Sequence, residues 1–231
     1  TMNSQISSKN TTNQSAILVI NCGSSSVKFS LIEPKSGLNI LSGLAECLTT
    51  PQAIIKIKHK TNKNDENLSE STSLIEPFGH QQALTVLVDK LKSLNLARII
   101  SAVGHRVVHG GEHYSKPTLI NDDVKLTIES LAKLAPLHNP ANLTGINACE
   151  HAFPKLPQIA VFDTAFHQSM PEKAYLYGIP FNLYAEHGIR RYGFHGTSHY
   201  YVANKVAQIT GKPIEECNLI SAHLGNGCSV T

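Results

Sequence analysis

An arginine and an aspartate each stand beside an apolar run that has the length of a β-strand. Arg106 follows the run Ile99–Val103, within the segment Gly104–Gly111, and Asp163 directly follows the run Gln158–Phe162. Residues at the carboxyl ends of strands in open α/β sheets often face a ligand. A guanidinium can bind carboxylate or phosphate through two hydrogen bonds, and a carboxylate can hold Mg²⁺. These residues are therefore candidates for anion and metal binding, although a salt-bridged arginine and a helix-capping aspartate fit the same pattern.

Two turns of small residues could cradle phosphate groups. In the first, Asn21–Ser26, backbone N–H groups and serine hydroxyls could approach an anion, with the Lys28 ammonium nearby. The second turn, His223–Gly227, follows another apolar run. Neither is a P-loop, and the first lacks the closing glycine of a nucleophile elbow. The first turn could equally be an ordinary hairpin, and the second partly mimics a dinucleotide fingerprint without its third glycine.

Two histidines are further candidates. His195 is flanked by glycines and stands just before a predicted helix, where the positive end of the helix dipole favours an anionic phosphoryl group. A metal site made by His195 and His199 lacks an apparent third ligand. His138 precedes Asn139-Pro140, which has the pattern of a first helical turn.

The elements that must position these residues form an α/β pattern. Apolar runs and period-two alternation predict strands over 16–21, 27–32, 38–46, 54–58, 99–103, 158–162 and 218–224. Helical spacing of apolar residues predicts helices over 81–96, 122–134, 139–153 and 197–209. The polar stretch 59–73 is predicted to be an exposed loop or hairpin tip. Together they indicate a mixed sheet flanked by helices.

Three parts are expected along the chain. Residues 1–15 are rich in Ser, Thr, Asn and Gln and are predicted to be a disordered tail. Residues 16–165 should form an amino-terminal α/β domain, and residues 166–231 should begin a second domain. Because this second part stops just after its first sheet-like element, it cannot bury both faces of a sheet, and we expect a truncated, incomplete domain.

Composition argues against several classes of function. The 231 residues carry a formal net charge of +3 without a clustered basic stripe, so no nucleic-acid partner is expected. No apolar run approaches the roughly 18 residues of a membrane span, so no membrane association is expected. The five cysteines are odd in number and far apart, which favours reduced thiols and a cytoplasmic location.

Six segments resemble motifs of the acetate kinase family, in the order found in that family: Asn21–Lys28, Gly104–Gly111, Leu137–Pro140, Phe162–His167, Tyr192–Ser198 and His223–Gly227. The resemblance covers nearly all of residues 16–231. It implies a ribonuclease H-like domain of the actin, Hsp70 and sugar kinase superfamily, followed by an incomplete second, nucleotide-binding domain of the same type. It also implies an ATP-dependent phosphotransferase that reversibly converts acetate and ATP into acetyl phosphate and ADP, as a homodimer that needs Mg²⁺ or Mn²⁺.

The resemblance also implies roles for individual residues. Arg106 would bind the substrate carboxylate, Asp163 is the family's acid/base position, and His195 would stabilise the transferring phosphoryl group. Because ionised acetate carries no proton for a base to remove, we expect Asp163 to act mainly by orienting Mg²⁺ and its waters. Asn21 would lie near the metal and His138 near the site. The methyl pocket would be walled by Val108, Leu137 and Phe194, and the ATP phosphates would meet Ser24, Ser26, Lys28, His223, Leu224, Gly225, Asn226 and Gly227.

Some family elements have no counterpart in the chain. A second active-site arginine, a metal-binding glutamate and the adenosine-binding segment are missing, so the fragment alone is expected to be inactive. A propionate or butyrate kinase is an alternative, because the three pocket residues do not decide between acyl chains. A non-catalytic phosphate-binding fragment is another.

Overall fold

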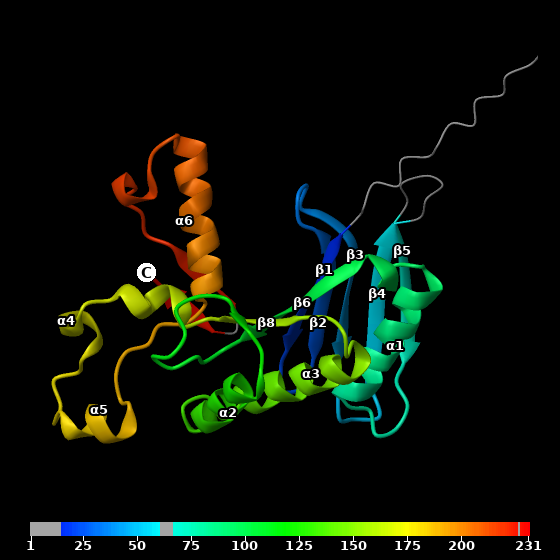
Figure 1. The fold of residues 1–231 in the computed structure, drawn as a ribbon, viewed down its shortest axis with the longest axis horizontal. Helices are drawn as coiled ribbons and strands as arrows, with labels where there is room; N and C mark the ends of the chain where they lie inside the picture. The colour runs from blue at the N-terminus through cyan, green and yellow to red at the C-terminus, as the bar shows by residue number, and fades with distance from the viewer. Residues whose placement is uncertain (1–14, 61–66, 226) are drawn as a thin grey trace, which may run out of the picture.

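The computed structural model describes residues 15–60, 67–225 and 227–231, and these build an eight-stranded sheet in the order β5-β4-β3-β2-β1-β6-β8-β7 (Figure 1). The predicted tail, apart from residue 15, and Asn226 lie outside the described residues. The strands are β1 (Ala16–Cys22), β2 (Val27–Glu33), β3 (Leu38–Glu46), β4 (Ile54–Lys60), β5 (Asn67–Ser73), β6 (Ile100–Val107), β7 (Thr118–Leu119) and β8 (Gln158–Phe162).

The sheet is mixed, and its parallel part sets the position of the site. Strands β1 to β5 pair antiparallel in chain order, whereas β1, β6 and β8 run parallel to one another. The register pairs Ile20 with His105 and Arg106 with Val161. Parallel strands end at the same edge of a sheet, so this register brings the ends of β1, β6 and β8 together.

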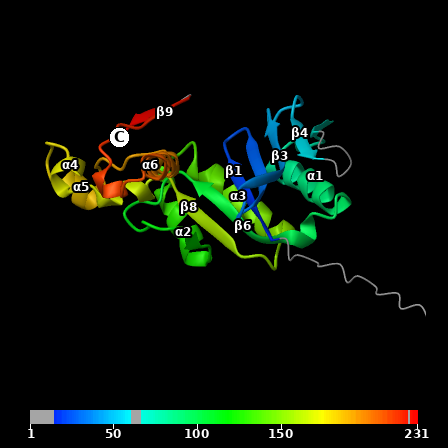
Figure 2. The same cartoon turned by 90° about the horizontal axis from the view of Figure 1, so that it is seen from above.

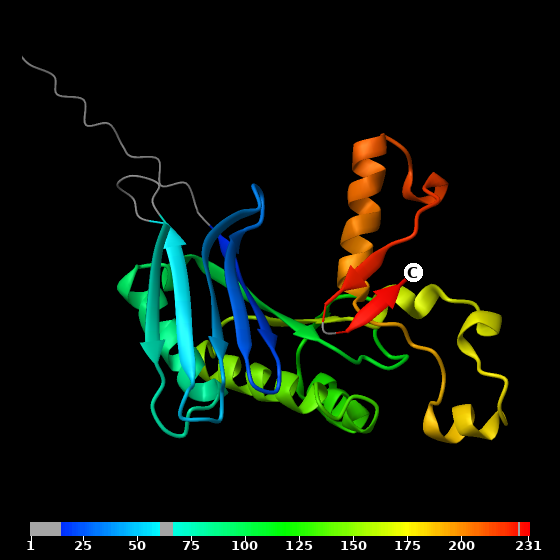
Figure 3. The same ribbon diagram turned by 180° about the vertical axis from the view of Figure 1, so that it is seen from behind.

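Two long helices cover one face of the sheet, as Figures 1 and 3 show. They are α1 (His80–Ser93) and α3 (Asn139–Ala152), which contact each other, and α2 (Asp122–Ser130) packs against α3. Helix α1 buries residues at a spacing of three and four, including Leu84, Leu87 and Leu91, against strand residues such as Leu18. The predicted mixed sheet flanked by helices is therefore confirmed.

The opposite face of the sheet is less covered. Val19 is 38% exposed, and Ile17, Ile159 and Val161 are half-buried. These side chains line a hollow of about 550 Å³ that reaches Thr197 at the start of α6 (Gly196–Thr210). Among the helices of the described residues, none combines the length and apolar character needed to cross a membrane.

The chain after β8 consists of short elements around one longer helix, α6, which extends away from the sheet (Figures 1 and 2). Its last strands, β9 and β10, form an antiparallel hairpin beside the start of α6. The other elements are η1 (Ala97–Ile99), η2 (Leu131–Lys133), η3 (Ala165–Ser169), α4 (Glu172–Tyr175), α5 (Asn182–His187), η4 (Ile214–Glu216), β9 (Ala222–Leu224) and β10 (Cys228–Val230).

The four predicted long helices are confirmed with small shifts in their ends. The predicted strand over 99–103 extends as β6 to Val107 and so contains Arg106, and two further predictions, one of a loop and one of a strand, need correction. The stretch 59–73, predicted to be an exposed loop or hairpin tip, does belong to a hairpin, but most of its described residues are strand, because β4 continues to Lys60 and Asn67–Ser73 forms the edge strand β5. Residues 61–66 lie outside the described part. The predicted strand over 218–224 is reduced to Ala222–Leu224, because its partner β10 is only three residues long.

Candidate active site

Arg106 and Asp163 contact each other where β6 and β8 end. Nη2 of Arg106 lies 2.6 Å from Oδ2 of Asp163, and Nε lies 3.1 Å from both carboxylate oxygens. The backbone N–H of Asp163 donates to the Val107 carbonyl oxygen, which continues the parallel ladder one residue beyond β8. The ladder therefore fixes the approach of the two side chains, with Arg106 next to last in β6 and Asp163 one residue after β8.

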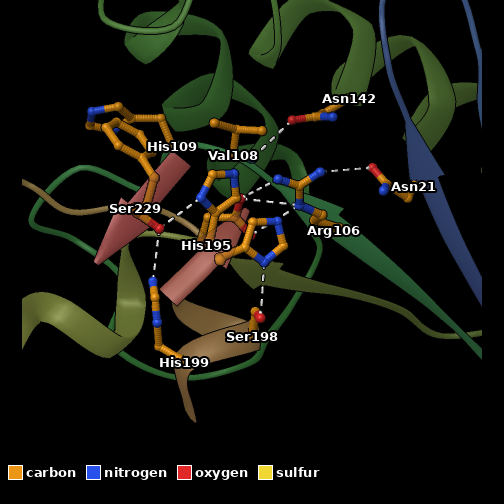
Figure 4. Close-up of polar contacts among 12 residues, drawn as sticks. Asn21, Arg106, Val108, His109, Asn142, His195, Ser198, His199 and Ser229 are labelled. Atoms are coloured by element: carbon orange, nitrogen blue, oxygen red, sulfur yellow. Dashed lines mark hydrogen bonds and ion pairs between the residues drawn. The ribbon is translucent and has the colours of Figure 1, made fainter. Parts of the chain in front are cut away.

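Asn21 joins this pair from the end of β1. Nη1 of Arg106 donates to Oδ1 of Asn21 at 3.4 Å, and Figure 4 shows the two side chains facing each other. Side chains from three neighbouring parallel strands thus meet around one guanidinium. Positions 21, 106 and 163 are far apart in the sequence, and the sheet register alone brings them together.

A pocket of about 470 Å³ opens in front of Arg106 and Asp163. Its walls come from the end of β6, the segment before α3, the segment before α6 and the β10 strand. It is lined by Arg106, Val108, Leu134, Ala135, Pro136, Leu137, His138, Asp163, Phe194, His195, Gly227, Cys228 and Ser229. The pocket thus combines one cation, one carboxylate and two histidines with apolar side chains.

The structure brings some predicted site residues together and leaves others apart. Val108, Leu137, Phe194, His138 and His195 all line the pocket with Arg106 and Asp163, and so does Gly227. Other predicted phosphate contacts lie outside its lining, namely Ser24, Ser26, Lys28, His223, Leu224 and Gly225. Lys28 instead borders the hollow on the sheet face, together with Asn21.

His195 occupies an unusual backbone position. It is the N-cap of α6 with φ of 54° and ψ of 26°, a left-handed conformation that residues other than glycine seldom adopt. Its ring stacks on His223 with centroids 4.0 Å apart, and its Nδ1 lies 2.9 Å from Ser229 Oγ. Burial is the main cause, and the nearby His223 the second, of a lowered pKa for His195, so the imidazole is favoured in its neutral form.

Two buried asparagines hold the pocket wall in place. Asn142 on α3 accepts a hydrogen bond from the Val108 backbone N–H at 3.0 Å and donates to the Cys22 carbonyl oxygen at 2.7 Å. Asn139, one turn earlier, accepts from the backbone N–H of His109 and donates to its carbonyl oxygen. From the sequence, Asn139 was recognised only as part of a first helical turn and Asn142 not at all, although asparagines at this spacing on the buried face of a predicted helix are a usable signal.

His109 lies behind the pocket and is almost completely buried. Its Nδ1 accepts a hydrogen bond from the Gly111 backbone N–H at 3.0 Å, and its ring packs edge-on against Tyr192 and Phe194. Burial lowers the pKa of His109 from its ordinary value of 6.5 to about 4. The ring is therefore a neutral support for Phe194 at physiological pH.

The oxygen atoms near Arg106 are suited to a hard divalent cation. In the described residues there is no group of three or more His, Cys, Asp or Glu side chains that could hold a metal by themselves. Mg²⁺, however, usually keeps several waters and takes one or two carboxylates together with substrate phosphates. The Asp163 carboxylate and the Asn21 amide oxygen fit that pattern. All five cysteines are free.

Comparison with known proteins places the chain in a family. The model of the acetokinase family matches residues 16–231. Acetate kinase 1 of Vibrio cholerae is 53% identical over 216 residues, which are 93% of this chain and 52% of that protein. A Francisella tularensis propionate kinase structure matches with a TM-score of 0.86 at 45% identity, covering 94% of this chain and 54% of that one.

A second solved structure, the acetate kinase of Porphyromonas gingivalis, matches with a TM-score of 0.81 at 42% identity and covers 94% of this chain and 54% of that one. The chain thus spans about half the length of the curated relatives it matches. Since the family model extends over nearly the whole sequence, the chain belongs to the acetokinase family.

Proposed function

We propose that this chain supplies the carboxylate-binding part of an acetate kinase, which transfers the γ-phosphoryl group of ATP reversibly to acetate. The observation that carries the proposal is the meeting of Arg106, Asp163 and His195 in one pocket with apolar walls. A short carboxylate has a charged end and an apolar end, and the pocket offers a partner to each.

Arg106 is the proposed partner of the substrate carboxylate. Asp163 engages Nε and Nη2, but each terminal nitrogen of a guanidinium carries two hydrogens, so donors remain for a second anion. The Arg106 side chain is 36% exposed and borders the pocket. Val108, Leu137 and Phe194 would then contact the methyl group of acetate.

The chemistry needs positioning and charge stabilisation more than proton transfer. A carboxylate oxygen of acetate forms a bond to the γ-phosphorus while the bond to the β,γ-bridging oxygen breaks, and ADP leaves with that electron pair. Charge spreads over the equatorial oxygens of a loose transition state. His195 would donate a hydrogen bond to one of these oxygens. Acetate is ionised at neutral pH, so no base is needed to activate it.

The same geometry suggests how the residues near Arg106 would serve a metal. Asn21 and Asp163 would hold Mg²⁺ or Mn²⁺, directly or through waters, and the ion would neutralise charge on the ATP phosphates. Asp163 would thereby orient the metal and its waters and also fix Arg106. We propose this orienting role in place of general acid/base catalysis.

The ATP phosphates are proposed to approach along the two small-residue turns. Lys28 pairs with Asn21 across the β1–β2 ladder, which places its ammonium group within reach of the Asn21 end of the site. Ser24 and Ser26 would contribute from the turn between these strands, and His223–Gly227 from the β9–β10 hairpin. Within that hairpin, Asn226 falls outside the described residues.

The domain and assembly proposals follow from the family. Residues 16–165 would form the amino-terminal domain, and residues 166–231 the beginning of the nucleotide-binding domain, in an enzyme that acts as a homodimer. A propionate kinase is the second candidate, because a propionate kinase structure matches with a TM-score of 0.86. The pocket volume of about 470 Å³ is large enough for either acyl chain.

A chimaera tests the proposal. Residues 16–231 of this chain are joined to the remaining part of the Vibrio cholerae relative, and acyl phosphate is trapped as hydroxamate with ATP, Mg²⁺ and either acetate or propionate. We expect acetyl hydroxamate, with a lower KM for acetate than for propionate. A lower KM for propionate would favour the second candidate. If the chimaera is folded but forms no acyl hydroxamate, while the unmodified relative is active in the same assay, both the acetate kinase and the propionate kinase candidates are refuted.

The 231-residue chain by itself is expected to show no useful kinase activity. Removing even one transition-state donor can cost about 10²–10³ in rate. Acyl hydroxamate formation by the chain alone at the rate of the chimaera would contradict the proposed division of the site.

A further inference from the structure

Ser229 lies between two imidazole rings. Its Oγ is 2.9 Å from Nδ1 of His195 and 2.8 Å from Nε2 of His199, as Figure 4 shows. The other nitrogen of His199, Nδ1, lies 3.0 Å from Oγ of Ser221. These four side chains, Ser221, His199, Ser229 and His195, form an unbranched row of three hydrogen bonds, which we call the Ser-His row.

The local fold places the members of the Ser-His row with little freedom. His195 and His199 are the N-cap of α6 and a residue one turn later, so their side chains lie on the same side of the helix. Ser229 lies on β10 opposite His223 of β9, and the backbone groups of Ser221 and Thr231 bond to each other at the open end of the hairpin. Ser221 and His199 are both buried.

Counting protons leaves two arrangements of the row in which Ser229 donates one hydrogen bond and accepts the other; a third, in which Ser229 accepts from both rings, also leaves Nε2 of His195 without a proton. A neutral imidazole has one donor and one acceptor nitrogen, and a hydroxyl has a single hydrogen to donate. If Ser229 donates to His195 Nδ1, it accepts from His199 Nε2–H, and His199 Nδ1 accepts from Ser221. The proton of His195 is then on Nε2. In the reverse arrangement every bond turns round, and Nε2 of His195 presents a bare lone pair.

The surroundings of His195 decide among these arrangements. Nε2 has no hydrogen-bond partner within the part of the chain that the structure describes, and the ring lines the pocket beside the carboxylate of Asp163. An Nε2–H would be attracted by the Asp163 carboxylate, whereas a lone pair there would be repelled, and Asp163 acts on His195 more strongly than its ionic partner Arg106. The first arrangement is therefore favoured.

We infer that Ser229 and His199 are positioning residues that hold His195 as the neutral Nε2–H tautomer, with its donor directed into the pocket. That this donor meets a transferring phosphoryl group rests on the proposed function; the tautomer does not. Burial lowers the pKa values of both His195 and His199, which agrees with a row of neutral rings.

The Ser-His row should also lower the basicity of His195. When His195 is protonated, both of its nitrogens donate, and one hydrogen-bond donor of the row is then left without a partner whichever way the row adjusts. Either Ser229 accepts from both rings and its own hydrogen has no partner in the row, or every bond turns round and the hydrogen of the buried Ser221 has none. Losing the Ser229 hydroxyl removes this penalty and should raise the pKa of His195. Four other titratable or charged groups act on His195. They are Arg106 on β6, Asp163 just after β8, His223 on β9 and His138 just before α3.

Nitrogen-15 NMR of the histidine rings in the 231-residue chain tests the inference without any enzyme activity. His195→Gln identifies the signals of His195. We expect a pyrrole-like Nε2 and a pyridine-like Nδ1 in the parent chain. In Ser229→Ala we expect a pKa of His195 that is higher by about 0.5 to 1, the equivalent of one hydrogen bond. Ser229→Thr, which keeps the hydroxyl, should restore the parent value.

Further variants separate the Ser-His row from general packing. His199→Gln keeps a donor toward Ser229 and should preserve the tautomer of His195, whereas His199→Phe removes the donor and should not. Ser93→Ala is a control, because the Ser93 hydroxyl donates to the Lys90 carbonyl oxygen on α1 and takes no part in the Ser-His row. A parent His195 protonated at Nδ1 would overturn the inference. The inference would also be overturned if Ser229→Ala kept the pKa of His195 unchanged while its dispersed NMR spectrum showed that the variant is folded.

Kinetics of the chimaera then address the link to catalysis. Ser229→Ala should lower kcat about tenfold and leave the KM for acetate nearly unchanged, and Ser229→Thr should recover most of the loss. An inactive chimaera together with the expected tautomer would refute the proposed function and leave this inference standing. The reverse result, an active enzyme with a His195 that ignores Ser229, would refute only the inference.

Discussion

The Asp163 carboxylate is almost entirely shielded from water and has the Arg106 guanidinium as its ionic partner, at 2.6 Å between Nη2 and Oδ2, whereas the Arg106 side chain is 36% exposed and faces the pocket. A buried charge without a partner costs several kcal/mol, so Asp163 depends on Arg106. Arg106 in turn has donors left for a second anion. In the proposed enzyme one guanidinium would therefore hold a resident carboxylate and a substrate carboxylate at the same time.

Replacing Arg106 by lysine should show that the side chain must bind both carboxylates at once. An ammonium group is a point charge and cannot present a planar set of donors to two carboxylates. In the chimaera we expect Arg106→Lys to raise the KM for acetate at least about tenfold and to lower kcat/KM by about 10²-fold. Steady-state kinetics by the hydroxamate assay measure this. Arg98→Lys, an exposed arginine just before β6, is the matched control and should leave both constants unchanged.

Replacing Asp163 by asparagine removes the charge and keeps the shape. We expect kcat of the chimaera to fall by about 10²–10³-fold, because the group that orients both Arg106 and the proposed metal is weakened. Raised Mg²⁺ should restore part of the loss if the carboxylate acts through the metal. Full activity with an unchanged Mg²⁺ dependence would rule out the proposed role of Asp163.

Asn142 is expected to matter for both stability and substrate binding. Asn142→Leu leaves the Val108 N–H and the Cys22 carbonyl oxygen buried without a partner, which should lower the free energy of unfolding by about 2 kcal/mol or more. Urea unfolding of the chain measures this effect. In the chimaera the KM for acetate should rise, since Val108 lines the pocket. Asn147→Leu changes an exposed asparagine on the same helix and should have little effect.

The parts of the fold that could be predicted from sequence are those with a strong periodic signal. Alternation in β1 and helical spacing in α1 arise because one face of each is buried, so pattern and structure have the same cause. Strand β5 carries no such signal. Its sequence, Asn67 to Ser73, is almost wholly polar, and it is a strand because its backbone pairs with β4 at the sheet edge.

The site shows the same division between local and long-range signals. Arg106 and Asp163 could be found because each stands beside an apolar run, and the pairing of β6 with β8 then makes them neighbours, with Arg106 inside β6 and Asp163 just after β8. The link from Ser229 to His195 could not be found, because it depends on how the β9–β10 hairpin packs against α6. A serine in a three-residue strand has no local pattern that indicates a histidine 34 positions earlier.

Stability of the chain should depend on pH through His109. Its folded-state pKa of about 4 lies below the ordinary value of 6.5, so the unfolded chain binds the proton first as the pH falls. The stabilisation is complete above about pH 6.5 and is lost progressively between about 6.5 and 4, by up to about 1.4 kcal/mol per pH unit.

Other histidines with lowered pKa values contribute to the same slope, so the test is a difference between two proteins. Urea unfolding of the parent chain and of His109→Gln is compared at several pH values from about 7 to about 4.5. The variant should be less stable at pH 7 and should lose less stability on acidification. Parallel stability curves for the two proteins would show that His109 is not held neutral by the fold.

Gly145 of α3 packs against Cys22 of β1, and its replacement tests the packing beneath the site. A Cβ atom added there would overlap Sγ of the buried Cys22 and lie 2.9 Å from its Cβ. Alanine favours a helix over glycine by about 1 kcal/mol, but overpacking of a core costs about 1–3 kcal/mol. Because both backbones belong to regular elements and cannot easily move apart, we expect Gly145→Ala to lower the melting temperature.

A second change at the contact should reveal the cause. Cys22→Ala removes Sγ, so the double variant with Gly145→Ala should be more stable than the sum of the two single effects predicts, by about 1 kcal/mol. Gly104→Ala is the matched control, because a Cβ there meets no atom within 4 Å. If Gly145→Ala melted at or above the temperature of the parent chain, α3 would not lie this close to β1, and the path from Asn142 to Val108 and Cys22 would need a different geometry.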